Sequence, residues 1–216
     1  IAQLMFNSPA GTSDAMDLAK MLAIIEMIKP LAGPNFRIWL QTRTGLLSYP
    51  LEQSAARAHL AASIYLQMAL KPDIVHIVGH TEADHAATAE NVIEAARMAR
   101  RAIENAMAGQ PVMLYDPAII KRKEQLISET KVTLSAIQKL SKYPERDAFT
   151  DPEVLALAVT SGILDAPQLK NNRFGKGQIK TRIIGGACLA VDDAGKPISE
   201  LQRLEKIFTS GGIERK

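Results

Sequence analysis

The hydrophobic and polar positions in the first half of the chain follow two alternating periods. Short, nearly unbroken apolar runs at 1–6, 36–40 and 73–78 are typical of strands buried on both faces. Each run is followed by a longer segment in which apolar residues recur every three or four positions, which indicates a helix. The pattern therefore predicts three βα units in succession.

Start and stop signals bound the three predicted helices. The first begins at Ser13 or Asp14, and the second covers 52–70. The third runs from the N-cap Thr88 to Gly109. The stripes that we expect to be buried are Leu18, Met21, Leu22, Ile25 and Ile28 in the first, Ala55, Ala58, Ala62, Tyr65 and Ala69 in the second, and Val92, Ala96, Ala99, Ile103 and Met107 in the third.

Buried strands that alternate with helices of this length form parallel sheets with right-handed crossovers. The fold class is therefore α/β, either a doubly wound sheet or part of a (βα)8 TIM-type barrel, and we predict the partial barrel. In both architectures ligands bind at the carboxyl ends of the strands. The functional candidates are therefore the loops that begin at Asn7, Gln41 and Gly79.

The chain changes character after residue 115. Proline directly after an N-cap aspartate predicts two helix starts, at Asp116 and Asp151. The first of these helices reaches about residue 141, and the second ends near Gly162. A polar surface loop follows at 169–177. We expect extended segments at 180–184 and 189–192 and a last helix over about 199–208. We therefore predict partial barrel units over 1–115 and an α-rich region with a short β-hairpin over 116–216.

Composition narrows the class of protein. With 47% hydrophobic and 23% charged residues the chain is globular, and a net charge of +3 on 26 basic and 23 acidic residues does not point to nucleic acid. The single cysteine, Cys188, favours a reducing, cytoplasmic compartment. Charged residues interrupt the most apolar stretch, so we expect no membrane span. Because the sequence begins inside a predicted strand, we expect a fragment of a longer protein.

Titratable side chains gather around the third strand exit, where His80, Glu82, Asp84 and His85 follow His76. These residue types bind divalent metals, so a metal-dependent hydrolase or lyase is one interpretation. Two histidines five residues apart across a loop do not match a zinc-binding helix motif, and we assign no metal ligand. We favour Glu82 and His80 as catalytic residues, a hydroxyl acceptor and a proton relay. His76 is expected to be a hydrogen-bonded core histidine.

The other two strand exits carry candidate substrate-binding groups. Arg43 lies in a glycine-containing loop, where its guanidinium either holds a carboxylate or phosphate in bidentate fashion or forms a salt bridge within the rim. Asn7 and Ser8 precede a helix start, a position that offers polar groups to an anion. We therefore predict substrate binding by Arg43, Asn7 and Ser8.

Three motifs together suggest a family. The sequence QTRTG at 41–45 precedes an alanine-rich helix, IVGHTEA at 77–83 precedes a helix initiated by threonine, and GILDAP at 162–167 follows a helix. This order resembles the later half of the large, barrel-forming subunit of cobalamin-dependent glutamate mutase (methylaspartate mutase) and its uncharacterised relatives. The resemblance extends over most of the chain.

The resemblance implies an isomerase, a carbon-skeleton mutase, in which a (βα)8 barrel caps the upper face of a corrinoid such as adenosylcobalamin. A separate Rossmann-like subunit or domain would bind the lower face and supply any histidine that coordinates cobalt. The substrate would be a small carboxylic acid. The implied cofactor-binding residues are Gln41, Thr42, Arg43, Thr44 and Gly45, together with Gly79 and with Glu82, which would hold the adenosyl ribose.

Association with other chains is expected from the strand count. Three βα units cannot close an eight-stranded barrel, and an open parallel sheet has unpaired edges. We therefore expect a homo-oligomer, or a partner that covers the edge at 1–6 or at 73–78. A non-catalytic binding or assembly domain is a further interpretation.

Because Gly79 and Ala83 leave room for a ligand, we expect Glu82 to affect function more than stability.

Overall fold

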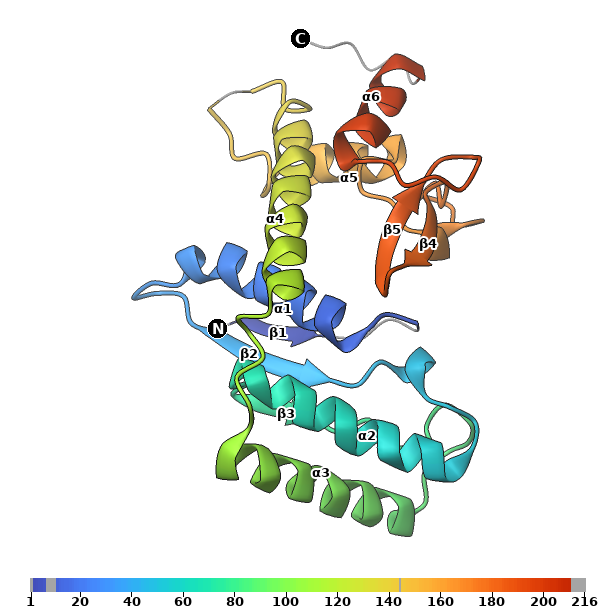
Figure 1. The fold of residues 1–216 in the computed structure, drawn as a ribbon. Coiled ribbons are helices and arrows are strands. Elements are labelled where there is room, and N and C mark those ends of the chain that lie inside the picture. Colours follow the sequence, from blue (N-terminus) through green and yellow to red (C-terminus); the bar gives the residue numbers. More distant parts are fainter. Residues whose placement is uncertain (1, 7–10, 144, 211–216) are drawn as a thin grey trace. The chain divides into compact units, whose positions relative to one another are not determined.

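The computed structural model describes residues 2–6, 11–143 and 145–210 (Figure 1). The chain divides into two units, Ile1–Glu124 and Gln125–Lys216, and the division falls within helix α4 (Pro117–Gln138). No helix in the described residues combines the length and the apolar composition needed to cross a membrane.

The first unit is built from βα repeats, which confirms the prediction of an α/β fold with parallel βα units. Its elements are β1 (Ala2–Phe6), α1 (Asp14–Ile28), β2 (Ile38–Arg43), α2 (Gln53–Gln67), β3 (Ile74–His76), α3 (Ala89–Gly109) and the start of α4, with short 3-10 helices at Lys29–Leu31, Leu46–Ser48 and Met68–Leu70. The strands form a parallel sheet in the order β1-β2-β3, in which Leu4 pairs with Leu40 and Thr42 with Val75. Closure into a barrel stays a prediction.

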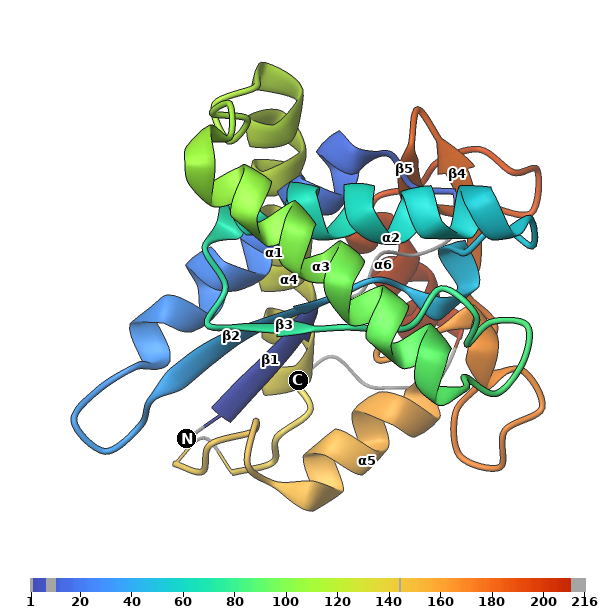
Figure 2. The ribbon, with the colours of Figure 1, turned by 90° about the horizontal axis from the view of Figure 1, so that it is seen from below.

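Helices α1, α2 and α3 cover one face of this sheet. Helix α1 contacts α2, and α2 packs along α3, as Figure 2 shows for the latter pair. Leu40 of β2 packs with Leu18 of α1, while Val75 of β3 packs against Leu60 of α2. Leu40 and Val75 lie on the same face by register, so the three helices share that face.

The predicted buried stripes are confirmed at Leu18 and Met21 of α1 and at Ala99 of α3, and they differ from the structure at other positions of α2 and α3. Leu18 and Met21 of α1 are fully buried, as predicted. In α2 the larger Leu60 and Ile64 are buried in place of Ala58 and Ala62, because they remove more apolar area from water. In α3 the buried residues are alanines, whereas the predicted core residues Val92 and Met107 are exposed: the buried set is Ala95, Ala99, Ala102 and Ala106. These small residues allow α3 to approach α2 closely.

The strands also differ from the prediction in their extent. Strand β2 continues to Arg43, so Gln41, Thr42 and Arg43 belong to the strand and not to its exit loop. Strand β3 is only three residues long, and its final residue, His76, is exposed. The prediction of a buried core histidine at this position is therefore wrong: the helices pack on the opposite face of the strand, where Val75 lies.

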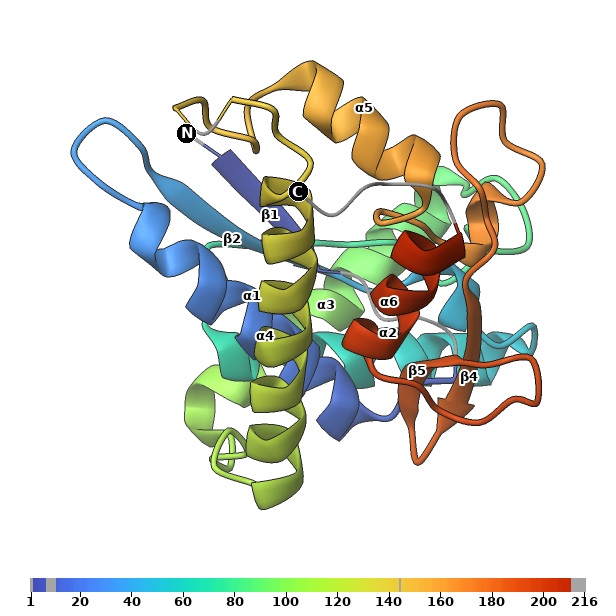
Figure 3. The same ribbon diagram turned by 90° about the horizontal axis from the view of Figure 1, so that it is seen from above.

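The described residues of the second unit form the later part of α4, two further α-helices and an antiparallel hairpin. After α4 come α5 (Pro152–Ser161), a 3-10 helix (Pro167–Leu169), β4 (Lys180–Ile184), β5 (Ala187–Val191) and α6 (Glu200–Ser210). Its core joins Ile137 of α4, Ala158 of α5 and Leu204 of α6. Figure 3 shows α6 beside the hairpin.

Two predicted helix starts and one predicted helix end in residues 116–216 are confirmed. The carboxylate of Asp116 accepts a hydrogen bond from the N–H of Ala118 at 2.7 Å, and that of Asp151 accepts one from Glu153 at 2.9 Å. These contacts satisfy donors that an isolated helix end leaves unpaired. Gly162 ends α5 with φ +85°, a left-handed conformation that favours glycine.

Candidate functional site

The two faces of strand β2 have different chemical roles. Side chains alternate across a strand, so Leu40 and Thr42 lie on the face covered by helices, and Gln41 and Arg43 on the opposite face. Arg43 is the register partner of His76 in β3, which places both on that opposite face. We name it the Arg43 face; it comprises Trp39, Gln41, Arg43, Ile74 and His76.

A hydrogen bond joins the two strands on the Arg43 face. The Gln41 side-chain amide nitrogen lies 3.3 Å from Nδ1 of His76. Gln41 is buried, Arg43 is half-buried and His76 is exposed, so the face combines a fixed amide, a guanidinium and an imidazole at the carboxyl end of the sheet. A guanidinium offers paired N–H donors that match a carboxylate.

The predicted cofactor residues Thr42 and Thr44 point the other way, toward the helices. Thr42 is fully buried, and Oγ1 of Thr44 lies 2.8 Å from Oγ of Ser63 in α2. The Gln67 amide donates to the same Ser63 hydroxyl at 2.9 Å. The contacts of Thr44 and Gln67 with Ser63 fix the end of β2 on α2. A ligand at the carboxyl ends of the strands would therefore meet the backbone of both threonines and not their side chains.

The exit loop of β2 is tied to the exit loop of β3. The hydroxyl of Tyr49 donates to the carbonyl of Val78 at 2.6 Å, and Oγ of Ser48 lies 3.0 Å from Nε2 of His59 in α2. Burial raises the pKa of Tyr49 to about 12, with a hydrogen bond from Thr44 acting against it. The phenol therefore stays protonated and holds the two strand exits together.

His80, predicted as a catalytic residue, is buried beneath its own loop. Its side chain is 1% exposed, and Nε2 lies 3.4 Å from Oε2 of Glu94 in α3. Glu94 also accepts from Arg57 of α2, at 2.7 and 3.2 Å, and this guanidinium holds the pKa of Glu94 below its usual range. His80 thus faces the α2–α3 ion pair, and among the described residues neither of its ring nitrogens makes a hydrogen bond.

The Glu82 carboxylate closes its own turn. Oε1 of Glu82 accepts a hydrogen bond from the N–H of Gly79 at 2.6 Å, while the residue as a whole is exposed. A Cβ at Gly79 would lie 3.1 Å from that oxygen, so the space expected to admit a ligand is occupied by Glu82 itself. The expectation that Gly79 leaves room for a ligand is therefore wrong.

The metal-ligand types at this exit do not come together. Asp84 pairs with His85 at 2.9 Å on the surface, away from the buried His80. Across residues 2–6, 11–143 and 145–210 the structure gathers no group of three histidine, cysteine or acidic side chains that could hold a metal ion. The interpretation as a metal-dependent hydrolase therefore gains no geometric support.

The loop that follows β2, which we call the rim, carries exposed leucines. Leu46 is 38% exposed, and Leu51 is 82% exposed in the loop before α2. Glu82 is likewise exposed, on the loop that follows β3. Asn7 and Ser8 lie outside the described residues.

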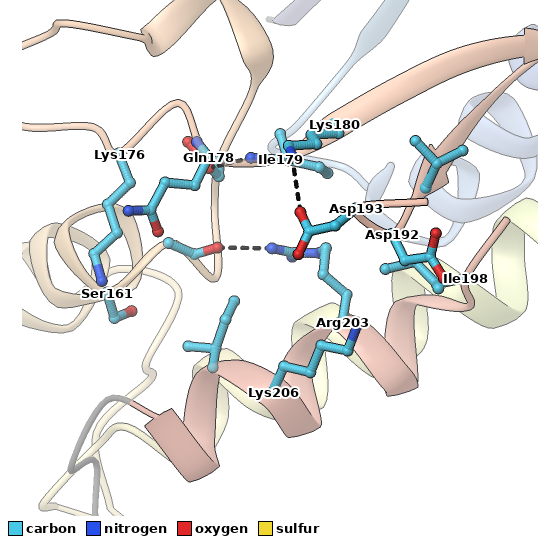
Figure 4. A pocket seen from close by; sticks show the side chains of 14 residues that line it. Ser161, Lys176, Gln178, Ile179, Lys180, Asp192, Asp193, Ile198, Arg203 and Lys206 are labelled. Carbon is cyan, nitrogen blue, oxygen red and sulfur yellow. Dashed lines mark hydrogen bonds and ion pairs between the residues drawn. The ribbon is translucent and has the colours of Figure 1, made fainter. Parts of the chain in front are cut away.

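A second candidate site lies in the second unit, where the sequence predicted only a surface loop and a hairpin. A pocket of about 310 Å³ opens between the end of α5, the hairpin and α6 (Figure 4). Its lining includes Ser161, Asp165, Lys176, Gln178, Lys180, Asp192, Asp193, Arg203 and Lys206. Sequence reasoning did not identify this site, because tertiary packing brings α6 together with the loop after α5 and the hairpin.

Comparison of the sequence with known protein families gives no matching family model, and comparison with curated proteins gives no significant match. Interpretation of the two sites therefore depends on their own geometry and on the sequence motifs.

Proposed function

We propose that the first unit is part of a (βα)8 barrel subunit of a cobalamin-dependent, glutamate mutase-like isomerase. In this proposal a small carboxylic acid binds on the Arg43 face, and a corrinoid lies against the strand ends. The observation that supports it best is the common placement of Arg43 and His76 at the carboxyl end of a parallel sheet whose other face is covered by helices.

Arg43 is the proposed substrate anchor. Its guanidinium donates two parallel hydrogen bonds to one carboxylate, which fixes both the position and the orientation of a small acid. Gln41 contacts Nδ1 of His76 at 3.3 Å and so restrains the imidazole. The other nitrogen of the His76 imidazole would form a hydrogen bond with a second polar group of the substrate.

The exposed rim is the proposed cofactor surface. Leu46 and Leu51 would pack against the corrin ring, and Glu82 would accept hydrogen bonds from ribose hydroxyls through its second carboxylate oxygen. When bound, adenosylcobalamin would supply the radical chemistry of a carbon-skeleton rearrangement. A separate Rossmann-like subunit or domain would hold the other face of the corrinoid.

Absorption spectroscopy tests the cofactor part of the proposal. Adenosylcobalamin is titrated into the complete protein together with its corrinoid-binding subunit or domain. We expect a saturable spectral change that weakens when Leu51→Asp places a charge on the rim. Leu31→Asp, at a leucine that is 65% exposed and lies before β2, is the matched control and should behave as the wild type. No spectral change, or equal loss in both variants, would contradict the proposal.

Self-association is proposed on the basis of the sheet edges. In the described part of the chain, β1 and β3 are the two outer strands of the parallel sheet, each paired on one side only. Such strands present backbone donors and acceptors that another chain can pair with. Light scattering of the full chain should give a mass that rises with concentration; a constant monomer mass would contradict this expectation.

A further inference from the structure

An apolar pocket lies in the first unit, between the short helix Met68–Leu70, the end of α3 and the connection from α3 to α4. Its volume is about 670 Å³, and most of its lining side chains are aliphatic or aromatic. Met68–Leu70 comes directly before β3, and α3 returns from the end of β3 toward the same level, so the pocket lies at the amino ends of the strands. It is therefore separate from Arg43 and the rim, which lie at the carboxyl ends.

The floor of the pocket belongs to the hydrophobic core. Met113 and Leu114 pack against the core cluster that joins Leu18 of α1 to Leu70. The Gln110 side chain donates a hydrogen bond to the carbonyl of Tyr65 in α2 and so holds the connection against that helix. A ligand would therefore meet a largely preformed floor.

The walls of the pocket carry large apolar side chains that stay in contact with solvent. Met107 is 76% exposed, Val112 is 74% exposed and Tyr115 is 80% exposed. Scattered exposed hydrophobic residues are ordinary, but three of them around one pocket are typical of a binding surface. A ligand that covers them would remove apolar area from water, which is the main driving force for binding an apolar group.

Lys71 is the only charged residue among the described residues that line the pocket. None of the ion pairs in the described part of the chain includes it. Asp73, two residues further along, does not line the pocket, and its carboxylate accepts a hydrogen bond from the N–H of Leu40 at 2.8 Å. The pocket lining therefore holds one positive charge and no negative charge.

The backbone conformation at Lys71 is unfavourable for a lysine. Its φ is +51° and its ψ is +58°, in the left-handed region that favours glycine and asparagine. The N–H of Lys71 donates to the carbonyl of Met68 at 3.0 Å and ends the short helix, a role that glycine fills without strain. The backbone thus gives no reason for a lysine at this position, whereas an anion bound in the pocket would give one.

We propose that this pocket binds a small amphipathic anion, a compound with a medium-length alkyl chain and a single negatively charged head group. The alkyl chain would cover Met107, Val112 and Tyr115, and the head group would pair with Lys71. The volume of about 670 Å³ lies within the range of small-molecule sites. Methionine side chains adapt to ligands of irregular shape, which suits a flexible chain. A membrane surface is a poorer match, because binding to anionic lipids needs a cluster of basic residues.

Calorimetric titration of the full chain with hexanesulfonate, octanesulfonate and decanesulfonate tests the proposal. Sulfonates keep the single negative charge and avoid the carboxylate that we assign to Arg43. We expect one molecule to bind per chain, with an affinity that rises about fourfold for each added methylene that becomes buried. Arg43→Gln should bind octanesulfonate as the wild type does.

Variants of the pocket test its two parts separately. Lys71→Gln should weaken octanesulfonate binding about two- to fivefold, as expected for an exposed ion pair. Met107→Asp should weaken it about tenfold or more, because it removes apolar area and places a negative charge on the wall. The matched controls are Lys29→Gln and Val92→Asp, at exposed residues of the first unit outside the pocket, and both should bind as the wild type does.

Lys71→Gly separates ligand binding from folding. Glycine adopts the left-handed conformation without strain, so this variant should have a higher melting temperature than the wild type and yet bind octanesulfonate as weakly as Lys71→Gln. The proposal is overturned by an affinity that does not depend on chain length, by unchanged binding in Lys71→Gly, or by equal losses in the controls or in Arg43→Gln. If the chain binds no sulfonate and Met107→Asp abolishes its self-association in light scattering, the pocket is a contact between copies and the proposal is wrong.

Discussion

The Asp165 carboxylate organises the loop that follows α5, and its removal is the most informative perturbation of the second unit. This one side chain accepts from the backbone N–H groups of Gly177, Gln178 and Ile179 at 2.7, 2.7 and 3.0 Å. The loop thereby returns to the end of α5 just before β4 begins. Asp165→Ala would leave three backbone donors without this acceptor.

The expected loss of stability follows from these three contacts. A hydrogen bond to a charged acceptor contributes roughly 1.5 to 3 kcal/mol when buried, but Asp165 is only half-buried and water replaces part of each contact, so we expect a total loss of about 2 to 4 kcal/mol. Asp165→Asn keeps one acceptor oxygen and should lose about half as much.

The pKa of Asp165 gives this prediction a pH dependence. Burial raises the pKa of Asp165, but the backbone donors outweigh burial and hold it below its usual range. Since the pKa is lower in the folded state, the stabilisation is complete above the unfolded value of about 4 and is lost as the pH falls through the folded value. The difference between wild type and Asp165→Ala should therefore shrink in acid.

Urea unfolding measures the change in free energy, and hydrogen exchange of the amides at 177–179 locates it. The control is Glu153→Gln, an exposed acid on α5, which should change the unfolding free energy by less than about 0.5 kcal/mol. An equally small change in Asp165→Ala, with unaltered exchange at 177–179, would refute the assigned role of this carboxylate.

Three further predictions concern other parts of the chain. Thr44→Val removes the hydroxyl that lies 2.8 Å from Ser63 and should lower the unfolding free energy by about 1 to 2 kcal/mol in urea titrations. An unchanged unfolding free energy would refute a structural role for Thr44. Burial lowers the pKa of His59 in the folded state, so the protein should lose stability as the pH drops below the unfolded-state pKa of about 6.5. The melting temperature of His59→Asn should therefore decrease less steeply with acid than that of the wild type. Gly177 and Gly185 have similar φ angles of +58° and +57°, but a Cβ at Gly177 would lie 2.0 Å from a backbone nitrogen, whereas a Cβ at Gly185 would meet no atom within 4 Å. Gly177→Ala should therefore lower the melting temperature much more than Gly185→Ala. Equal decreases would contradict the packing difference.

Local chemistry made several elements predictable from the sequence. A proline after an N-cap aspartate correctly predicted the starts of α4 and α5, and Thr88 correctly predicted the start of α3. These signals depend only on neighbouring residues, which satisfy the free donors at a helix start. The parallel order of the three strands followed from their alternation with helices.

Features that depend on tertiary packing could not be predicted in the same way. Helix α3 offers an alanine face and a face with Val92 and Met107, and periodicity alone favoured the larger residues although α2 packs on the alanines. His76 was expected to be buried because the sequence does not reveal which strand face the helices cover. Lys176 and Lys206 meet at the pocket only through the folding of α6 against the hairpin.

Binding of small carboxylic acids to the complete protein, measured by calorimetry for Arg43 variants, tests the account's central claim most directly. We predict that a small dicarboxylic acid binds the wild type, that Arg43→Gln weakens this binding by about tenfold or more through loss of a bidentate contact, and that Arg43→Lys restores it only in part. Arg101→Gln, at an arginine of α3 whose side chain is 73% exposed, is the control and should bind as the wild type. Equal binding by wild type and Arg43→Gln would contradict the assignment of the Arg43 face as the substrate site.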